Sequence, residues 1–434
     1  MRLSTSMFYE LGMRGIQRQL TDQLDLQQKI SAGRRVLKPS DDPMAAASVI
    51  GLDQAKGLNT QYSANASTAN AALGLEEQAL ADAMRVLQDV KSLAITAGNP
   101  VLKNEDRVSL AAQVRGLYDE LLGIANRTNG EGEYLFSGYK GTTKPFSESA
   151  PGVVAYSGDE GERLLQIAPQ RRISASDSGA DVFQRVRAGN GTFVASAAGA
   201  NTGTAITDAG TVRNATAWNN PANSGDYTIV FHVDSMVAPP VTTYDIVDNV
   251  AGLSMLTGLA PAAGPYARAY QPGVAIAFSR QPGDPSAAAW DSGAEVVITG
   301  TPASGDTFTV ERSPMQDVFA TVHELIDALK TGISLMPSSR AVYQNSLNAM
   351  GASLDHALDH ILTARAATGS RMVEIESMQE TSQDLGLRYE EERSRLVDLD
   401  YAGALSEITR KQVSLEAAQK SYVAVTRLNL FDFL

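Results

Sequence analysis

The chain has 434 residues, a formal net charge of −13 and no cysteine. An acidic surface repels phosphate, which argues against binding to nucleic acid or to an anionic membrane. The lack of cysteine excludes disulfides, thiolate metal sites and thiol catalysis. Apolar residues make up 43% of the chain but aromatic residues only 6%, and this small-residue composition suits thin helical pairs better than one thick core.

Residues 1–32 are predicted to form a helix that ends at Gly33, because glycine tolerates the left-handed conformation that often terminates a helix. The apolar residues of this helix are Ile16, Leu20, Leu24, Leu26 and Ile30. The N-terminus carries no apolar run of signal-peptide length, so we expect that a general secretory signal does not export the chain.

A loop follows, and its end has the residues that start a helix. Ser40, Asp41 and Asp42 offer capping oxygens and negative charge, and Pro43 suits the first helical position. We therefore expect a second helix to begin immediately after this loop.

That second helix is predicted to span about residues 44–98. Apolar residues recur along it at alternating spacings of three and four, and only Ser48, Asn59 and Glu76 break the pattern. Such a heptad pattern, lined mostly by alanine, predicts close packing against another helix. A third helix follows, and we expect Asn104 to cap it.

The C-terminal part repeats this architecture in reverse order. A short helix around residues 318–329 precedes a second long helix, which opens at Pro337 and has a mostly apolar heptad pattern between Leu347 and Leu399. A final helix begins near residue 400. The simplest arrangement is a hairpin in which the two long helices run antiparallel.

The middle of the chain, residues 140–314, is rich in Gly, Pro, Thr, Ala and Ser. Runs of alternating apolar residues predict strands at 227–233, 244–247, 274–278, 295–299 and 307–310. The loop 302–306 predicts that the last two strands form a hairpin. Tyr134–Gly138 is interpreted as a strand that leaves the helical region. Residues 188–225 have few large apolar side chains, and we expect them to be poorly ordered.

Together these patterns predict a multidomain α+β protein. Its long N- and C-terminal helices form an antiparallel coiled-coil rod, and a mainly β domain is inserted between them. The predicted parts are terminal helical segments 1–44 and 400–434, a helical rod domain 45–140 and 315–399, and an inserted β domain 141–314. A lone terminal helix cannot bury its apolar stripe, so we expect residues 1–32 and 400–434 to be disordered in the isolated monomer.

Histidine is rare, which leaves few candidates for a metal or catalytic site. His356 and His360 lie four apart on a predicted helix, as a zinc ligand pair requires, but no third ligand is identifiable and we interpret them as a solvated flank. His323 opens a near match to His-Glu-x-x-His in which Asp327 replaces the second histidine, and we interpret it as structural. His232 is interpreted as a surface residue. We predict no catalytic residues, no metal and no cofactor.

The segment from Ser31 to Ala47, SAGRRVLKPSDDPMAAA, closely resembles the N-terminal signature of the flagellin superfamily. Within it, the Pro-Ser-Asp-Asp-Pro form is similar to the hook-associated junction proteins of that superfamily. The signature residues are Arg34, Pro39, Ser40, Asp41, Asp42 and Pro43. Residues 134–138, 297–310 and 430–434 agree with the same resemblance, which covers roughly residues 1–145 and 295–434.

The resemblance implies a structural subunit of the bacterial flagellum that forms a ring connecting the hook to the flagellin filament. It also implies export, unfolded, through the flagellar type III apparatus to an extracellular location. The implied partners are further copies of the chain, the first hook-associated protein on the hook side, flagellin and a flagellar export chaperone. No nucleic acid, membrane or small-molecule substrate is expected.

Three alternatives remain open: flagellin itself, an exported adhesin that binds a ligand through the middle domain, and a zinc-dependent hydrolase. In the preferred interpretation, neighbouring subunits bury the apolar residues of the two terminal segments. The predicted assembly interface consists of Ile16, Leu20, Leu24, Ile30, Leu405, Ile408, Leu415, Tyr422, Leu428, Leu430, Phe431 and Phe433.

Overall fold

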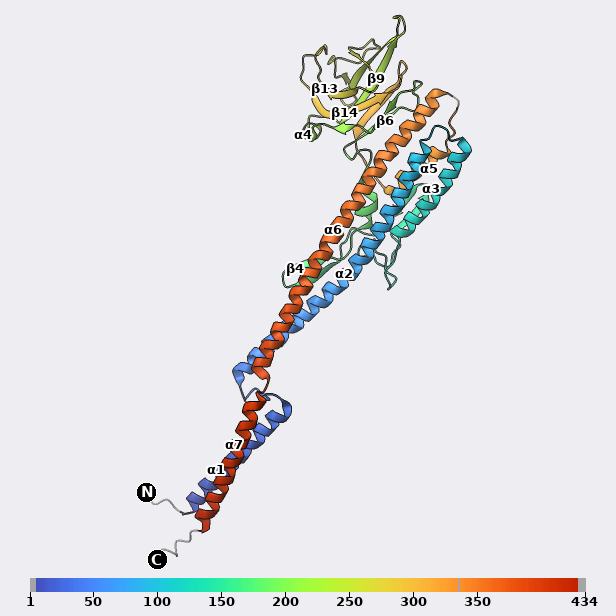
Figure 1. Ribbon diagram of the computed structural model, residues 1–434. Helices are drawn as coiled ribbons and strands as arrows, with labels where there is room; N and C mark the ends of the chain where they lie inside the picture. Colours follow the sequence, from blue (N-terminus) through green and yellow to red (C-terminus); the bar gives the residue numbers. More distant parts are fainter. Residues whose placement is uncertain (1–4, 335, 428–434) are drawn as a thin grey trace, which may run out of the picture. The chain divides into compact units, whose positions relative to one another are not determined.

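The computed structural model describes residues 5–334 and 336–427 (Figure 1). The α-helices of this part are α1 Thr5–Ala32, α2 Pro43–Ala97, α3 Asn104–Ala125, α4 Ala215–Trp218, α5 Val318–Lys330, α6 Pro337–Val397 and α7 Tyr401–Arg427, with a π-helical turn at Ala180–Gln184. None of the described helices combines the length and the apolar character that crossing a membrane requires.

The strands lie between α3 and α5. Their bounds are β1 Phe146–Ala150, β2 Val153–Tyr156, β3 Leu164–Ala168, β4 Arg171–Ser174, β5 Val186–Arg187, β6 Phe193–Ala197, β7 Ile206–Thr207, β8 Thr211–Val212, β9 Asp226–Asp234, β10 Val241–Asp248, β11 Leu253–Ser254, β12 Arg268–Ala269, β13 Ala275–Ser279, β14 Asp291–Thr299, β15 Thr307–Arg312 and β16 Met315–Gln316. Long helices at both ends and a β-rich middle confirm the predicted α+β class.

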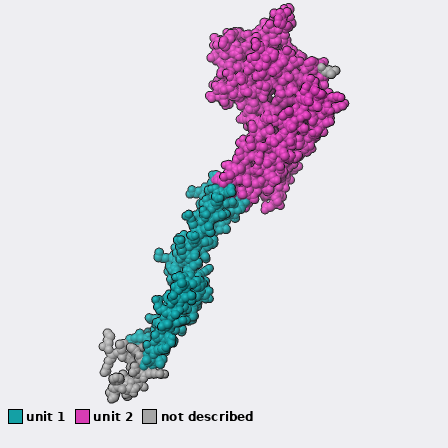
Figure 2. All heavy atoms as spheres, viewed as in Figure 1, with its two compact units in different colours: residues 1–67, 166–171, 376–434 teal, residues 68–165, 172–375 magenta. Residues whose placement is uncertain are grey.

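The chain forms two compact units, which Figure 2 colours separately. Unit 1 takes in residues 1–67, 166–171 and 376–434, and unit 2 takes in residues 68–165 and 172–375. Both long helices, α2 and α6, contribute residues to each unit. The predicted division into terminal segments, rod and β domain is a different one, and it stays a prediction.

Within unit 1, α2 and α6 run antiparallel. Asn59, one of the polar positions that break the predicted heptad pattern, donates from Nδ2 to the carbonyl oxygen of Ser382 at 2.7 Å. The Nε atom of Arg393 lies 3.1 Å from Oδ1 of Asp53. Residues early in α2 therefore pair with residues late in α6, which is the predicted hairpin arrangement of the two long helices.

Unit 2 contains a helical core in which α2, α3, α5 and α6 lie together (Figure 1). Leu73, Leu80 and Leu87 continue the heptad pattern of α2 and have no exposed surface. Four phenylalanine rings pack beside these helices, with neighbouring ring centroids between 5.2 and 6.0 Å apart. They belong to Phe136, Phe146, Phe183 and Phe319, and they bring the segments after α3 into the same core as the helices.

Residues 193–312 of unit 2 contain two sheets that share one core, and the remaining strands form the two-stranded sheets β1-β2, β3-β4 and β5-β16. The first has the strand order β11-β10-β9-β15-β6, with β12 beside β10, and the second has the order β13-β14-β7, with β8 beside β14. Phe193, Ile229 and Phe308 of the first sheet belong to the same apolar core as Ile276 and Ile298 of the second. The alternating apolar residues of the predicted strands thus face inward.

The predicted hairpin between the last two strands of this region is wrong. β14 pairs with β13, whereas β15 pairs with β9 and β6. In the loop 302–306, Oδ2 of Asp306 accepts hydrogen bonds from the amides of Gly203 and Ala303 at 3.0 and 2.8 Å. This carboxylate holds the loop open, so the chain passes from one sheet to the other instead of folding back.

Residues 188–225 were expected to be poorly ordered, and this expectation is wrong. The segment contains β6, β7, β8 and α4. Its two large aromatic residues, Phe193 and Trp218, are buried, and their ring centroids lie 5.3 Å apart. Oδ1 of Asn190 accepts hydrogen bonds from the amides of Thr192 and Phe193. Two buried rings and local amide hydrogen bonds order a segment whose overall composition is poor in large apolar residues.

The segment Tyr134–Gly138 is a series of turns, not the predicted strand. Phe136 is fully buried in the helical core, and Gly138 has φ of +66°, a left-handed conformation that glycine adopts readily. The aromatic residues here fill the core of unit 2 and do not mark an alternating strand.

Asn104 is the first residue of α3, not its predicted cap. The capping acceptor is Oδ2 of Asp106, which accepts a hydrogen bond from the amide of Lys103 at 3.0 Å. The side chain of Asn104 instead bonds the backbone of Ile333 in the connection between α5 and α6, where Oδ1 accepts from the amide at 3.1 Å.

Candidate assembly surface

The segment that joins α1 to α2 packs against the connection between α6 and α7. The amide of Arg35 donates to the carbonyl oxygen of Val397 at 2.7 Å, and the amide of Leu399 donates to the carbonyl oxygen of Gly33 at 3.1 Å. Gly33 has φ of +67°, and a Cβ atom there would lie 2.7 Å from the hydroxyl of Tyr401. Glycine is therefore required by conformation, as predicted, and also by space.

Asp41 and Asp42 organise the start of α2. Oδ2 of Asp41 accepts hydrogen bonds from the amides of Lys38 and Leu37, both at 3.0 Å. Oδ1 of Asp42 accepts from the amide of Ala45 at 3.0 Å, which makes Asp42 the N-cap, as expected. These backbone donors favour the charged carboxylates and hold the pKa of both groups below their usual range.

The remaining signature residues have simpler positions. Pro43 is the first residue of α2, as its fixed φ angle favours. Arg34 forms an isolated antiparallel β-bridge with Asp398. Pro39 and Ser40 are exposed. The signature thus fixes the turn between α1 and α2, and its two central residues, Pro39 and Ser40, are exposed to solvent.

Helices α1 and α7 pack side by side and antiparallel in unit 1 (Figure 1). A Cβ atom at Gly12 would lie 2.9 Å from the ring of Tyr422, which also contacts Tyr9 edge-on. The less exposed residues recur at spacings of three and four, as in a coiled coil. They include Gly12, Ile16, Gln19, Gln23, Leu26 and Ile30 of α1 and Ala404, Ile408, Lys411, Leu415, Ala418 and Tyr422 of α7.

This helix pair buries little of its own seam. Among the described residues of α1 and α7, only Leu26 and Ala404 are buried, at 8% and 6% exposure. Oε1 of Gln19 lies buried without a hydrogen-bond partner among the described residues. Lys411 also occupies the seam, with Nζ 3.9 Å from Oδ2 of Asp22. Polar side chains at seam positions lower the stability of a helix pair.

A second apolar stripe on α1 is uncovered. Met13, Leu20 and Leu24 recur at spacings of seven and four, which places them on one face of the helix. They are 49%, 48% and 51% exposed. At 100° per residue this face lies about 100° around the helix from the seam that contacts α7. Leu405 of α7 is also exposed, at 54%.

The structure divides the predicted interface residues into three groups. Leu20, Leu24 and Leu405 are exposed. Half-buried within the seam between α1 and α7 are Ile16, Ile30, Ile408, Leu415 and Tyr422. Outside the described residues lie Leu428, Leu430, Phe431 and Phe433. The prediction missed Met13, although its spacing of seven residues from Leu20 is visible in the sequence.

His356 and His360 do not form the expected solvated flank. His356 lies beneath Gly191, where a Cβ atom would fall 1.7 Å from its Nε2 atom. Nε2 of His360 lies 2.7 Å from the carbonyl oxygen of Asp181. Both rings thus contact residues between the π-helical turn and β6 or within that turn, namely Gly191 and Asp181. In the described part of the chain, no group of three or more His, Cys, Asp or Glu residues could hold a metal ion.

The other two histidines also make packing contacts. His323 lies edge-on to the ring of Tyr118, and its Nε2 atom is 3.4 Å from Oδ2 of Asp327, which fits the predicted structural role. His232, expected at the surface, is half-buried beside Tyr266, with ring centroids 6.2 Å apart.

Residues 3–141 match the family described as the bacterial flagellin N-terminal helical region. Flagellar hook-associated protein 3 of Escherichia coli K12 is 25% identical over 100% of this chain and 99% of its own length. The protein of the same name from Salmonella typhimurium is 36% identical over 43% of this chain and 58% of its own. The chain is a homologue of flagellar hook-associated protein 3.

A solved structure supports the same relation. The flagellar junction protein FlgL from Legionella pneumophila is 29% identical, with a TM-score of 0.68 over 81% of this chain and 100% of that one. The similarity to hook-associated protein 3 spans both helical ends and the inserted region together. It supports a structural role in the bacterial flagellum and a location there.

Proposed function

We propose that the chain is a structural subunit of the hook–filament junction, in which copies of the chain form a ring. The whole-length similarity to hook-associated protein 3 supports this role. The observation that carries it in the structure is the uncovered stripe of Met13, Leu20 and Leu24 on a helix pair that buries little of its own seam.

The stripe gives an energetic reason for assembly. Each of its three side chains has about half of its surface left to bury, so covering one contributes roughly 1 kcal/mol. A single contact between two subunits is therefore weak. The same contact repeated around a closed ring adds up, because a heterologous interface repeated by rotation builds a tubular assembly.

The two ends of the ring meet different partners in this proposal. The first hook-associated protein lies on the hook side and flagellin lies on the filament side, and each supplies helical surface that covers the α1–α7 pair. Before assembly, a flagellar export chaperone covers the exposed apolar residues of the terminal helices. The chain then leaves the cell unfolded through the flagellar type III apparatus.

We infer that the chain has no enzymatic activity. The relatives are flagellar subunits by name, and the histidines that resembled zinc ligands make packing contacts instead. Metal analysis of the purified protein tests this inference, since a stoichiometric zinc content would contradict it.

Complementation tests the junction role directly. In a motile bacterium whose own junction gene is deleted, expression of this chain is expected to restore filaments and swimming. Purified chain mixed with filament seeds is expected not to grow long filaments by itself. Long filaments of this chain alone would favour the alternative that it is a flagellin, and failure to restore any filament would contradict the junction role.

Amide hydrogen exchange tests the proposed state of the free subunit. In purified monomer at micromolar concentration, residues 5–32 and 400–427 are expected to exchange rapidly, because the α1–α7 seam is too poorly buried to be stable alone. The rest of the two predicted segments, residues 1–4 and 428–434, lies outside the described residues. The buried part of α2 around Leu80 is expected to be protected. Strong protection of both terminal segments without oligomers would contradict the proposal.

A further inference from the structure

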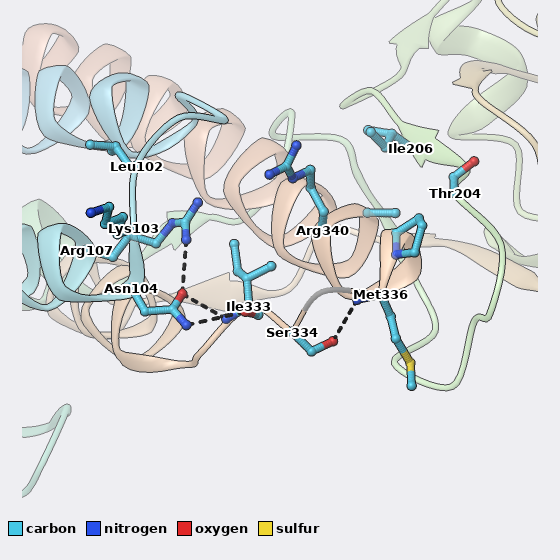
Figure 3. A pocket seen from close by; sticks show the side chains of 12 residues that line it. Leu102, Lys103, Asn104, Arg107, Thr204, Ile206, Ile333, Ser334, Met336 and Arg340 are labelled. Atoms are coloured by element: carbon cyan, nitrogen blue, oxygen red, sulfur yellow. Dashed lines mark hydrogen bonds between the residues drawn. The ribbon is translucent and has the colours of Figure 1, made fainter.

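A cationic pocket lies in unit 2, between the start of α3, the connection from α5 to α6, the start of α6 and β7 (Figure 3). Its volume is about 560 Å³. Three basic residues line it, Lys103, Arg107 and Arg340, and none of its lining residues is Asp or Glu. This concentration of positive charge is unusual in a chain with 36 basic and 49 acidic residues.

Arg107 is the member that most needs a counter-charge. It is 4% exposed, and its Nε atom is buried with no hydrogen-bond partner among the described residues. One terminal nitrogen donates to Oδ1 of Asn104 at 3.1 Å, and the guanidinium lies 4.9 Å from the ring centroid of Tyr343. These neutral contacts do not neutralise its charge, and a buried charge without a partner is costly.

Arg340 and Lys103 add charge from the exposed side of the pocket. The guanidinium of Arg340 donates to the carbonyl oxygen of Pro100 at 3.2 Å. In the part of the chain that the structure describes, none of the three basic side chains forms an ion pair. Figure 3 shows that Arg107 and Arg340 line the pocket from two different helices, α3 and α6.

Hydrogen bonds between Asn104 and Ile333 hold the part of the lining between Arg107 and Arg340 in place. Asn104 accepts from the amide of Ile333 at 3.1 Å and donates to its carbonyl oxygen at 3.3 Å, as the dashed lines in Figure 3 show. Since the same Oδ1 atom accepts from Arg107, the buried guanidinium is positioned before any ligand enters.

We propose that this pocket binds a small oxyanion. Planar guanidinium groups donate paired hydrogen bonds to the oxygens of phosphate or carboxylate. Arg107 and Arg340 supply these donors, and the ammonium of Lys103 supplies a third charge. A free tetrahedral anion such as inorganic phosphate and the carboxylate of an acidic side chain on a neighbouring polypeptide share this chemistry. The inference does not depend on the proposed junction role.

Calorimetric titration of the purified full-length chain tests the proposal. Inorganic phosphate and acetate are titrated separately at constant ionic strength. Saturable binding of one equivalent is expected for at least one of them. The double variant Lys103→Gln with Arg340→Gln is expected to bind at least about tenfold more weakly, since a hydrogen bond to a charged group contributes about 1.5–3 kcal/mol. Arg388→Gln, an exposed position on the same helix outside the pocket, is the matched control and should bind like the wild type.

The affinities for phosphate and for acetate distinguish the two sources of the ligand. Tighter binding of phosphate assigns the pocket to a free tetrahedral anion, and tighter binding of acetate assigns it to a carboxylate group. Arg107 stays unchanged in these variants because it is buried, so the fold is expected to be preserved, and circular dichroism of each variant checks this. Absence of binding by both anions, or equal affinity in the wild type and the pocket variant, would overturn the proposal.

Discussion

The helical core of unit 2 and the α1–α7 pair of unit 1 have similar sequence patterns but bury very different amounts of apolar surface. In unit 2, Leu80 and Leu87 are fully buried, because α3, α5 and the phenylalanine cluster cover α2 in addition to α6. In the α1–α7 pair each helix has one partner. Leu26 is 8% exposed, and Leu20 keeps about half of its surface.

A heptad pattern therefore predicts that a helix packs against another helix, but it does not predict how many elements cover that helix. The core of unit 2 is completed within the chain by segments distant in sequence, such as Phe319 on α5. The α1–α7 pair lacks such covering elements among the described residues, and its seam contains Gln19 and Lys411. A region left unfinished in this way is suited to be completed by neighbouring subunits.

The largest expected effect is on the core of unit 2. Phe319 has no exposed surface and contacts the rings of Tyr118, Phe146 and Phe183. Phe319→Ala removes a buried ring and leaves a cavity, which is expected to cost about 3–5 kcal/mol. The midpoint of the main thermal transition followed by circular dichroism should fall by roughly 5–8 °C, since unit 2 has about 300 residues. A fall of less than about 2 °C would show that this cluster does not hold the core together.

A smaller effect of opposite sign is expected at the buried carboxyl of α2. Glu76 is 2% exposed, its Oε1 atom accepts from the amide of Asp177 at 3.1 Å, and its Oε2 atom has no partner among the described residues. Burial, together with the nearby Asp177 carboxylate, raises the pKa of Glu76 well above its usual range despite the proximity of Arg371.

The raised pKa fixes the direction of the pH dependence. The folded chain binds this proton more tightly than the unfolded chain, so Glu76 contributes stability below about pH 4.5 that is lost as pH rises through the folded pKa. Glu76→Gln is therefore expected to raise Tm at pH 7 by about 1–2 °C, the shift that roughly 1 kcal/mol produces in a unit of about 300 residues, and to change little near pH 4.

Thermal scans at the two pH values check this prediction. Glu77→Gln is the matched control, because Glu77 is half-exposed and pairs with Arg365, so no stabilisation is expected there. An unchanged or lowered Tm for Glu76→Gln at pH 7 would mean that the buried carboxylate is well compensated by its surroundings.

The smallest expected effect is at the seam of the α1–α7 pair. Leu26→Ala removes the best-buried side chain of α1, yet Tm of the main transition should change by less than about 1 °C, because the pair is not part of the stable core of the free monomer. The same thermal scan measures it. A fall of more than about 5 °C would show that the pair unfolds together with the core.

Local signals in the sequence predicted much of the fold. The heptad patterns located both long helices, Asp42 and Pro43 located the start of α2, and alternating residues located the four longest strands and β13. Strand pairing was less accessible, because the loop at Asp306 crosses between sheets through contacts with residues about 100 positions earlier. Residues 188–225 are ordered by two buried aromatic residues, Phe193 and Trp218. The average composition of the segment does not reveal the effect of two such residues.

The candidate assembly surface was predicted only in part. The sequence grouped Ile16 with Leu20 and Leu24, whereas the structure places Ile16 in the seam and the two leucines on the uncovered face. Residue spacing alone could not show which of the two apolar stripes of α1 faces α7. The cationic pocket was out of reach for a related reason, because Arg107 and Arg340 lie far apart in sequence and meet only through packing.

The most direct measurement of the central claim changes the uncovered stripe alone. Leu20→Asp with Leu24→Asp is expressed in the junction-deleted bacterium. The matched control is Ser414→Asp with Ser421→Asp, two exposed positions of α7 on the side of that helix opposite Leu405. The stripe variant is expected to keep the wild-type Tm and to be exported, yet to leave flagellin unattached in the medium, while the control cells swim. Normal filaments and swimming with the stripe variant would contradict the claim that this surface joins the subunits.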